Sequence, residues 1–165
     1  MPEQIVLMNK DRIARTLKRL AIQVWERLQP DQELVLIGLN ERGFATAKGI
    51  HSQLVKMMGA EIEIHKLDVL NTGPKKTLPS CTEKFVLMID DVIFSGKTMF
   101  GALATLCYSN EPQNIEVLTL VDRGHRTYPV LSELTGIVVP TKFGEHIEVI
   151  LNDEELHQVV LFKNM

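Results

Sequence analysis

The sequence has few cysteines and no long apolar run, so it offers little for disulfide cross-links or for anchoring in a membrane. Only two cysteines, Cys81 and Cys107, occur among 165 residues, and their spacing suits neither a metal site nor a disulfide framework. No apolar run approaches the roughly 20 residues that span a bilayer, and the first such run is too short for a signal peptide. We therefore expect a cytoplasmic protein.

An excess of either charge is also missing. The chain carries 18 lysines and arginines against 21 aspartates and glutamates. Bulk charge therefore argues neither for nor against a nucleic-acid partner, and any basic patch must be local. The sequence shows no internal repeat and no low-complexity segment. A chain of this length fits one domain, residues 1–165, which would bury roughly 70% of its unfolded surface.

What the sequence does contain is an alternation of apolar strands and amphipathic helices. Buried strands are predicted at residues 34–37, 85–89 and 115–121, where apolar runs do not alternate with polar residues. Further strands are predicted at 60–67, at 136–139 and in a C-terminal hairpin of 147–151 and 159–162. Helices are predicted to about residue 28, with Asn9 or Asp11 as the cap, after residue 43 and after residue 98. This order indicates an α/β fold with a doubly wound parallel sheet, whose ligands bind at the carboxyl ends of the strands.

The most informative stretch is residues 84–106, KFVLMIDDVIFSGKTMFGALATL. Two carboxylates, Asp90 and Asp91, stand where the apolar strand should end, and a bend of small and hydroxyl residues follows before a helix. That bend consists of Ser95, Gly96, Lys97 and Thr98. Unpaired N–H groups and hydroxyls at a helix start form a seat for a phosphate. Carboxylates would repel a phosphate, so we expect them to face ribose hydroxyls, a divalent metal or a developing positive charge on a sugar.

Two other interpretations of this stretch were weighed. The GKT triplet occurs in the nucleotide-binding pattern GxxxxGK(S/T). The first glycine of that pattern would fall on Asp91, whose carboxylate would project where the loop must wrap a phosphate. The plainer interpretation is an ordinary strand and capped helix with two solvated aspartates.

A second phosphate seat is predicted at Gly38–Gly43, where another buried strand is followed by a glycine-bounded loop and a helix. Arg42 in that loop could hold pyrophosphate. The plain alternative is a tight turn with a surface arginine. Residues 71–83 form a polar loop in which Lys75 and Lys76 either reach a polyphosphate or are simply solvated.

The first predicted helix carries a basic stripe opposite its apolar one. Its members are Arg12, Arg15 and Arg19, with Lys18 beside them. One interpretation is the solvated face of an amphipathic helix, and the other is a surface that contacts RNA phosphates.

Four segments together resemble one known family. They are LIGLNERG, IDDVIFSGKT, LVDRGHRTYPV and VVPTKFGEHIEVIL. The second resembles the phosphoribosyl-pyrophosphate (PRPP) motif of type I phosphoribosyltransferases. VDRGHR with the Pro-Thr-Lys ending narrows the resemblance to the bifunctional pyrimidine-operon regulators and uracil phosphoribosyltransferases. The resemblance implies the type I phosphoribosyltransferase fold, with a small hood region beside the parallel sheet.

The resemblance also implies a reaction, in which uracil and PRPP give UMP and pyrophosphate as in pyrimidine salvage, and it assigns residue roles. Asp90 and Asp91 would contact ribose hydroxyls directly or through Mg²⁺, and residues 95–98 would bind the 5′-phosphate. Leu39, Asn40, Glu41, Arg42 and Gly43 would bind pyrophosphate. Asp122, Arg123 and His125 would lie near the hood over the base. A homo-oligomer, a dimer or larger, is expected as well.

Two departures from the family pattern qualify the expected function. The loop at residues 71–83 looks short and lacks the Arg-Asp-Asp cluster that follows the preceding strand in relatives. Ile22 stands where RNA-binding relatives carry a histidine. The alternative functions are therefore a nucleotide-sensing, RNA-binding regulator with little catalytic activity, and a sugar-phosphate binding module without turnover.

Overall fold

A computed structural model describes residues 3–69 and 78–163. The elements follow in the order β1 (Glu3–Met8), α1 (Lys10–Arg27), β2 (Leu34–Leu39), α2 (Asn40–Met58), β3 (Glu63–Leu67), β4 (Phe85–Ile93), α3 (Lys97–Ser109), β5 (Asn114–Asp122), β6 (Leu134–Val138), β7 (His146–Asn152) and β8 (Glu155–Lys163). Among these residues, no helix is long and apolar enough to cross a membrane.

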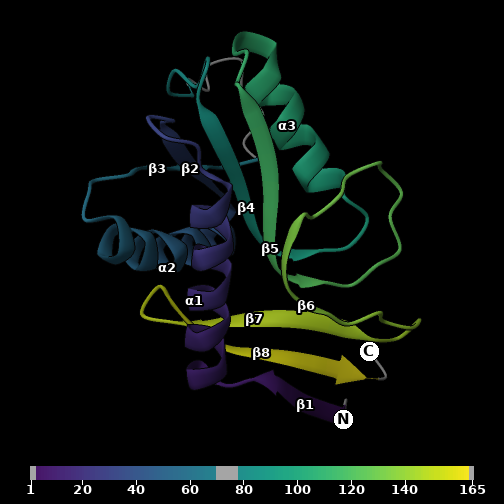
Figure 1. Ribbon diagram of the computed structural model, residues 1–165. Helices are drawn as coiled ribbons and strands as arrows, with labels where there is room; N and C mark the ends of the chain where they lie inside the picture. Colours follow the sequence, from purple (N-terminus) through teal and green to yellow (C-terminus); the bar gives the residue numbers. More distant parts are fainter. Residues whose placement is uncertain (1–2, 70–77, 164–165) are drawn as a thin grey trace.

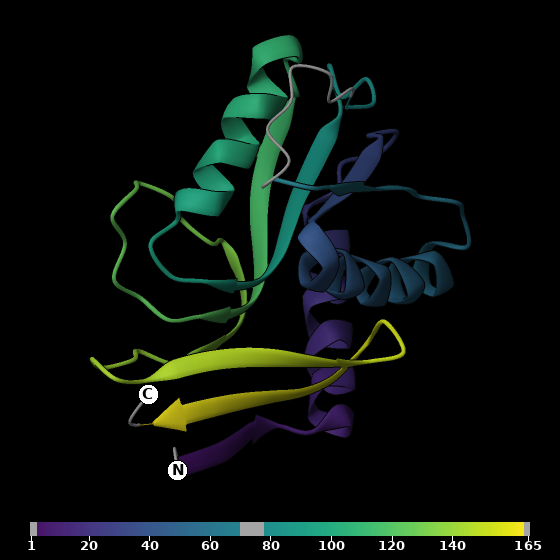
Figure 2. The same ribbon diagram turned by 180° about the vertical axis from the view of Figure 1, so that it is seen from behind.

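A five-stranded parallel sheet forms the centre, in the order β3-β2-β4-β5-β6. Strand β4 lies in the middle, and its residues 85–89 are fully buried, which confirms the prediction from their unbroken apolar run. The α1 and α2 helices pack on one face of the sheet and α3 packs on the other (Figures 1 and 2). The doubly wound α/β fold is therefore confirmed.

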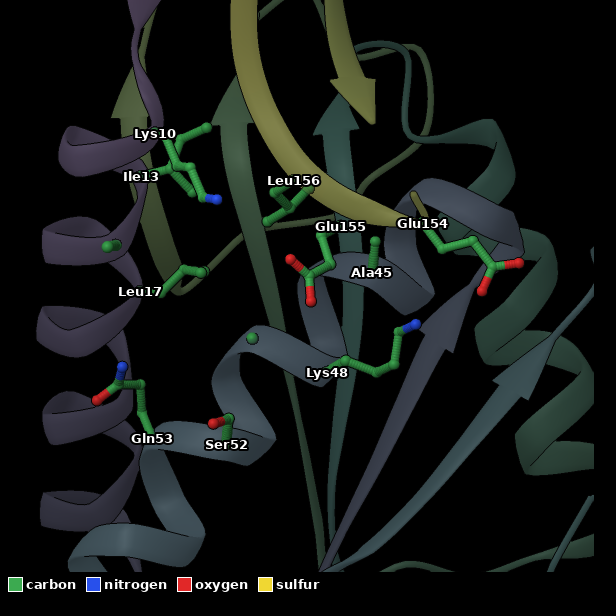
Figure 3. Close-up of a pocket in the computed structure, with 12 residues that line it drawn as sticks. Lys10, Ile13, Leu17, Ala45, Lys48, Ser52, Gln53, Glu154, Glu155 and Leu156 are labelled. Atoms are coloured by element: carbon green, nitrogen blue, oxygen red, sulfur yellow. The ribbon is translucent and has the colours of Figure 1, made fainter. Parts of the chain in front are cut away.

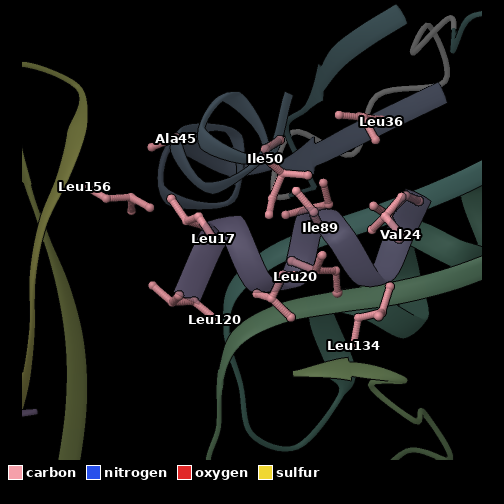
Figure 4. Packing of buried hydrophobic residues seen from close by; sticks show 14 of the residues in the cluster. Leu17, Leu20, Val24, Leu36, Ala45, Ile50, Ile89, Leu120, Leu134 and Leu156 are labelled. Carbon is pink, nitrogen blue, oxygen red and sulfur yellow. The ribbon is translucent and has the colours of Figure 1, made fainter. Parts of the chain in front are cut away.

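The α1 helix illustrates how the pattern becomes packing. Asn9 caps it, because the Asn9 side chain accepts a hydrogen bond of 2.9 Å from the Arg12 amide. Leu17, Leu20 and Val24 point from this helix into a core shared with α2 and the strands (Figure 4). Burying each such side chain contributes about 1.5–3 kcal/mol.

A second sheet, antiparallel and in the order β1-β8-β7, lies beneath the carboxyl ends of β4 and β5 (Figure 1). It corresponds to the expected hood region. The β7–β8 hairpin was predicted, and its turn places Asp153 and Glu154 at φ of 50° and 65°, the mirror-image geometry that suits hairpin twist. Strand β1 was not predicted, because its short apolar run was considered only as a possible signal.

Several predicted boundaries were wrong, among them the start of β8, which is Glu155 rather than residue 159. The strand expected to end before Asp90 continues to Ile93, because β5 pairs with it as far as Asp122. The expected loop after Gly38 is absent from the described chain, since β2 reaches Leu39 and α2 begins at Asn40. The strand expected from residue 60 begins at Glu63, although its predicted edge position is confirmed.

Candidate active site at the ends of the parallel strands

The two carboxylates lie in the second half of β4 and have different surroundings. Asp90 is 8% exposed, whereas Asp91 is only partly buried and lines a cavity. This fits strand geometry, in which successive side chains point to opposite sides. The Asp91 amide donates a 2.8 Å hydrogen bond to the Asp90 carboxylate. Asp91 is therefore the carboxylate that a ligand in the cavity would meet.

Burial raises the pKa of Asp90 well above its usual range, and the neighbouring charge of Asp91 adds to the shift. The side chain lies against the first turn of α2 at Gly43. A Cβ at Gly43 would lie 2.9 Å from the Ile89 carbonyl oxygen and 3.1 Å from an Asp90 carboxylate oxygen. Only glycine lets the start of α2 approach β4 this closely, and this approach brings the second predicted phosphate seat against the acidic pair.

The predicted phosphate seat after β4 has the expected form. Gly96 is the N-cap of α3 with φ of +86°, which glycine adopts without strain. The Lys97 amide donates to the Ser95 hydroxyl at 3.2 Å, and Lys97 and Thr98 are exposed. The first amides of any helix lack intrahelical partners. Residues 95–98 thus present amides and hydroxyls at a helix start, which is what an anion needs.

The second predicted seat is the junction of β2 and α2 rather than a loop. The Asn40 side chain accepts a hydrogen bond from the Val69 amide at 2.9 Å, and Glu41 pairs with Lys66. Arg42 turns toward the hood, where its Nε donates to the Val149 carbonyl at 2.8 Å and an Nη lies 3.5 Å from the Glu148 carboxylate. Of the five residues assigned to pyrophosphate, Gly43 lies against Asp90, Arg42 lines the same cavity as Asp91, and Leu39 ends the buried strand β2.

Two of the three residues expected near the base, Arg123 and His125, contact Phe94, an exposed aromatic residue that the sequence reasoning did not single out. The Arg123 guanidinium lies 4.2 Å from the Phe94 ring centre, and His125 packs edge-on against the same ring at 5.9 Å. His125 donates through Nε2 to the Thr141 carbonyl at 2.7 Å. Asp122 is held by Arg126 instead of facing the ring, with carboxylate–guanidinium distances of 2.8 and 2.9 Å.

Asp122 and Arg126 form a bidentate ion pair. Partial burial alone would raise the pKa of Asp122, but hydrogen bonds from Arg126 and from the Gly124 amide outweigh it and lower the pKa. Arg126 belongs to the segment VDRGHR, in which sequence reasoning assigned it no role of its own. Its i+4 spacing from Asp122 was a signal that could have identified the pair.

Two adjoining cavities occupy the space between the sheets. A cavity of about 350 Å³ is lined by Arg42, Asp91 and residues 146–149 of β7. A cavity of about 660 Å³ is lined by His125 and residues 140–145, and is mainly apolar. Phe94 and Arg123 line both cavities. The site therefore has a charged part beside the acidic pair and an apolar part beside the loop of residues 140–145.

The acidic pair could also hold Mg²⁺. Among residues 3–69 and 78–163, no group of three or more metal-ligating side chains occurs. Mg²⁺ commonly binds through one or two carboxylates and the phosphates of a substrate. Asp91, which faces the cavity, fits that arrangement, whereas the Asp90 carboxylate is buried and accepts the Asp91 amide.

One sequence prediction lies away from this site, and another cannot be placed because it falls outside the described chain. On α1, Arg12 donates to the Leu7 carbonyl, and Arg19 donates to the Gly136 carbonyl at 2.7 Å, whereas Arg15 is exposed. Lys75 and Lys76 of the loop predicted at residues 71–83 fall within residues 70–77, outside the described chain. A further hollow, of about 310 Å³, lies between α1, α2 and the β7–β8 turn, with Lys10, Lys48 and Glu155 at its rim (Figure 3). None of the site residues predicted at the strand ends lines this hollow.

Comparison with known proteins agrees with this architecture. Residues 7–152 match the phosphoribosyl transferase domain, and the chain belongs to this family. Among curated proteins it is similar to "Bifunctional protein PyrR" of Microcystis aeruginosa, with 34% identity over 92% of this chain and 93% of that protein. It is also similar to the protein of that name from Synechocystis sp., with 35% identity over 94% of both chains. The resemblance inferred from the four sequence segments is therefore confirmed.

Solved structures show the same fold. A hypoxanthine phosphoribosyltransferase from Trypanosoma cruzi, in complex with the product IMP, superposes with a TM-score of 0.76 at 18% identity and covers 98% of this chain and 91% of its own. A hypoxanthine-guanine-xanthine phosphoribosyltransferase superposes with a TM-score of 0.73 at 23% identity, covering 96% and 94%. At such identities the likeness concerns the fold alone.

Proposed function

We propose that the protein transfers a 5-phosphoribosyl group from PRPP to a pyrimidine base, uracil, giving UMP and pyrophosphate. The observation that carries this proposal is the contact between Gly43 and Asp90. It brings the start of α2, the acidic pair and the phosphate seat at the start of α3 to one edge of one sheet. Only a ligand with two phosphate groups on either side of a sugar would use all three. Residues 1–165 would act as one domain.

The binding assignments follow the site. The 5′-phosphate lies on the amides and hydroxyls of Ser95–Thr98, and the ribose hydroxyls lie on Asp91, whose amide is held by Asp90. The pyrophosphate lies on Arg42 and on the amides at the start of α2, residues 39–43. The base lies against Phe94 in the apolar cavity, near Arg123 and His125.

The chemistry requires no protein nucleophile. The bond between C1 of the ribose and the pyrophosphate oxygen breaks as a bond to the base nitrogen forms, and that nitrogen loses its proton. Positive charge develops on the sugar, so the Asp91 carboxylate stabilises the transition state electrostatically. Mg²⁺ bound with PRPP would neutralise charge on the departing pyrophosphate. Arg42, held by β7, orients this leaving group, and the hood limits access of water.

Measuring pyrophosphate release tests this function. The purified protein is incubated with PRPP, Mg²⁺ and one base from a panel of uracil, hypoxanthine, guanine, adenine and orotate. We expect release with uracil, and loss of that release in Asp91→Asn. Release with a purine alone would refute the pyrimidine assignment but keep the transferase. PRPP binding without release from any base would favour a sugar-phosphate binding module.

A second candidate is an RNA-binding regulator with little catalytic activity. Arg15 on α1 is exposed, and Trp25 on the same helix is 48% exposed, so the surface offers one cation and one ring on which a base could stack. Ile22 between them is 39% exposed and offers no hydrogen bond. RNA binding by a protein that also fails to release pyrophosphate would favour this candidate.

A further inference from the structure

The loop after β5 packs against the start of the bend at residues 95–98, which is the predicted phosphate seat. Arg126 is its central side chain, with Nη1 donating to the Phe94 carbonyl at 2.9 Å and Nε donating to the Val130 carbonyl at 2.9 Å. The same guanidinium holds both carboxylate oxygens of Asp122. One side chain thus joins the end of β5, its own loop and Phe94, the residue just before the bend after β4.

Backbone groups of the same loop hold Ser95, the first residue of the bend. The amides of Thr127 and Tyr128 both donate to the Ser95 carbonyl, each at 2.9 Å. A Cβ on Gly96 would lie 3.3 Å from the Tyr128 carbonyl and 3.4 Å from the Val130 side chain. The chain therefore contacts the loop after β5 through three consecutive residues, Phe94, Ser95 and Gly96.

These contacts determine where the seat points its donors. In a planar trans peptide, the N–H of one residue points opposite to the C=O of the residue before it. Because the carbonyls of Phe94 and Ser95 are turned toward the β5 loop, the amides of Ser95 and Gly96 are turned away from it, toward the open side of the bend. The direction of the phosphate-binding amides thus depends on the loop that accepts the two carbonyls.

We propose that Arg126 is a positioning residue that aims the amides of the phosphate seat. It acts through the Phe94 carbonyl and not through the ligand, because its charge is paired with Asp122 and its Nε and Nη1 also donate to backbone carbonyls. This inference rests on the proposed function and adds a role to a residue outside the PRPP motif. The guanidinium is needed for its forked geometry, since an ammonium cannot hold both oxygens of Asp122 and two carbonyls together.

Binding measurements with two half-ligands test the proposal. Ribose 5-phosphate uses the seat after β4, whereas inorganic pyrophosphate uses Arg42 and the start of α2. Calorimetric titrations of Arg126→Lys should show affinity for ribose 5-phosphate reduced at least about tenfold, with affinity for Mg²⁺-pyrophosphate changed less than about twofold. Asp122→Asn is a milder second variant that should show the same selectivity. Arg27→Gln is the matched control, because it breaks the Arg27–Glu116 ion pair away from the site and should change neither affinity.

Each other outcome has a defined meaning. Equal loss of both affinities in Arg126→Lys and Asp122→Asn would show a merely structural role and would overturn the proposal. Unchanged affinity for ribose 5-phosphate in both variants would overturn it as well, and would leave the proposed function intact. If the unmodified protein does not bind ribose 5-phosphate, residues 95–98 are not a phosphate site, and both the proposed function and this inference are refuted.

Discussion

Replacing Gly43 by alanine tests whether the start of α2 must touch β4. Gly43 lies in the first turn of α2, and a glycine-to-alanine change inside a helix ordinarily stabilises a protein by about 0.5–1 kcal/mol. Here the new methyl group would lie 2.9 Å from the Ile89 carbonyl oxygen and 3.1 Å from an Asp90 oxygen. Both atoms belong to the central strand and have little room to move. Overpacking of this kind costs about 1–3 kcal/mol, which exceeds the helical gain.

The expected net result is a loss of about 1–2 kcal/mol in the free energy of unfolding. For a chain of this size that corresponds to a fall in Tm of about 2–8 °C. Urea denaturation and thermal melting followed by circular dichroism measure both quantities. PRPP affinity should fall as well, because the shift displaces the acidic pair.

Gly101→Ala is the matched control for this prediction. Gly101 lies inside α3, and its nearest neighbour to a new methyl group is a Val69 side-chain carbon at 3.9 Å, an ordinary contact. The control should therefore stabilise the protein by about 0.5–1 kcal/mol. If Gly43→Ala proves as stable as Gly101→Ala, the close approach of α2 to β4 is wrong, and the argument that joins the two phosphate seats is wrong with it.

Three further predictions concern single side chains. Burial raises the pKa of Asp90, so the native state keeps a proton that the unfolded state has lost, and stability falls as pH rises from about 4 through the raised pKa. Asp90→Asn should remove that fall. Urea denaturation at about pH 5 and pH 8 should therefore show that the variant becomes more stable relative to the unmodified protein as pH rises. If the difference in stability between the two proteins is the same at both pH values, the raised pKa of Asp90 is refuted. Arg42→Gln should weaken pyrophosphate binding while changing stability by less than about 1 kcal/mol, because its ion pair with Glu148 is exposed; unchanged affinity in calorimetry would exclude Arg42 from the pyrophosphate site. If the protein binds RNA, Arg15→Ala should reduce the slope of log affinity against log salt by about one, and an unchanged slope would place the RNA elsewhere.

The sequence predicted the fold well where periodicity alone decides structure. The apolar run at residues 85–89 and the stripe on the first helix are local patterns, and both elements lie where they were expected. The hairpin around residue 153 was also predicted from local turn residues. Strand β1 was missed because its six residues become a strand only by pairing with β8, about 150 positions later in the chain, and no local pattern carries that information.

The candidate site divides in the same way. The acidic pair and the bend at residues 95–98 form one continuous motif, so sequence reasoning could place them together. It could not foresee that β4 runs on past both carboxylates, since that extension comes from pairing with β5. Nor could it foresee that Asp122 is held by Arg126, or that Arg42 donates to a carbonyl of β7. These contacts join segments far apart in sequence and depend on the folded arrangement of strands and hood.

The most direct test of the account is a crystal structure of the protein with PRPP and Mg²⁺ in the absence of a base. The account predicts that the 5′-phosphate lies on the amides of Ser95–Thr98, the ribose hydroxyls on Asp91 and the pyrophosphate beside Arg42. Density for PRPP at another place on the molecule, or a sugar turned away from Asp91 while its phosphate occupies the bend, would contradict it.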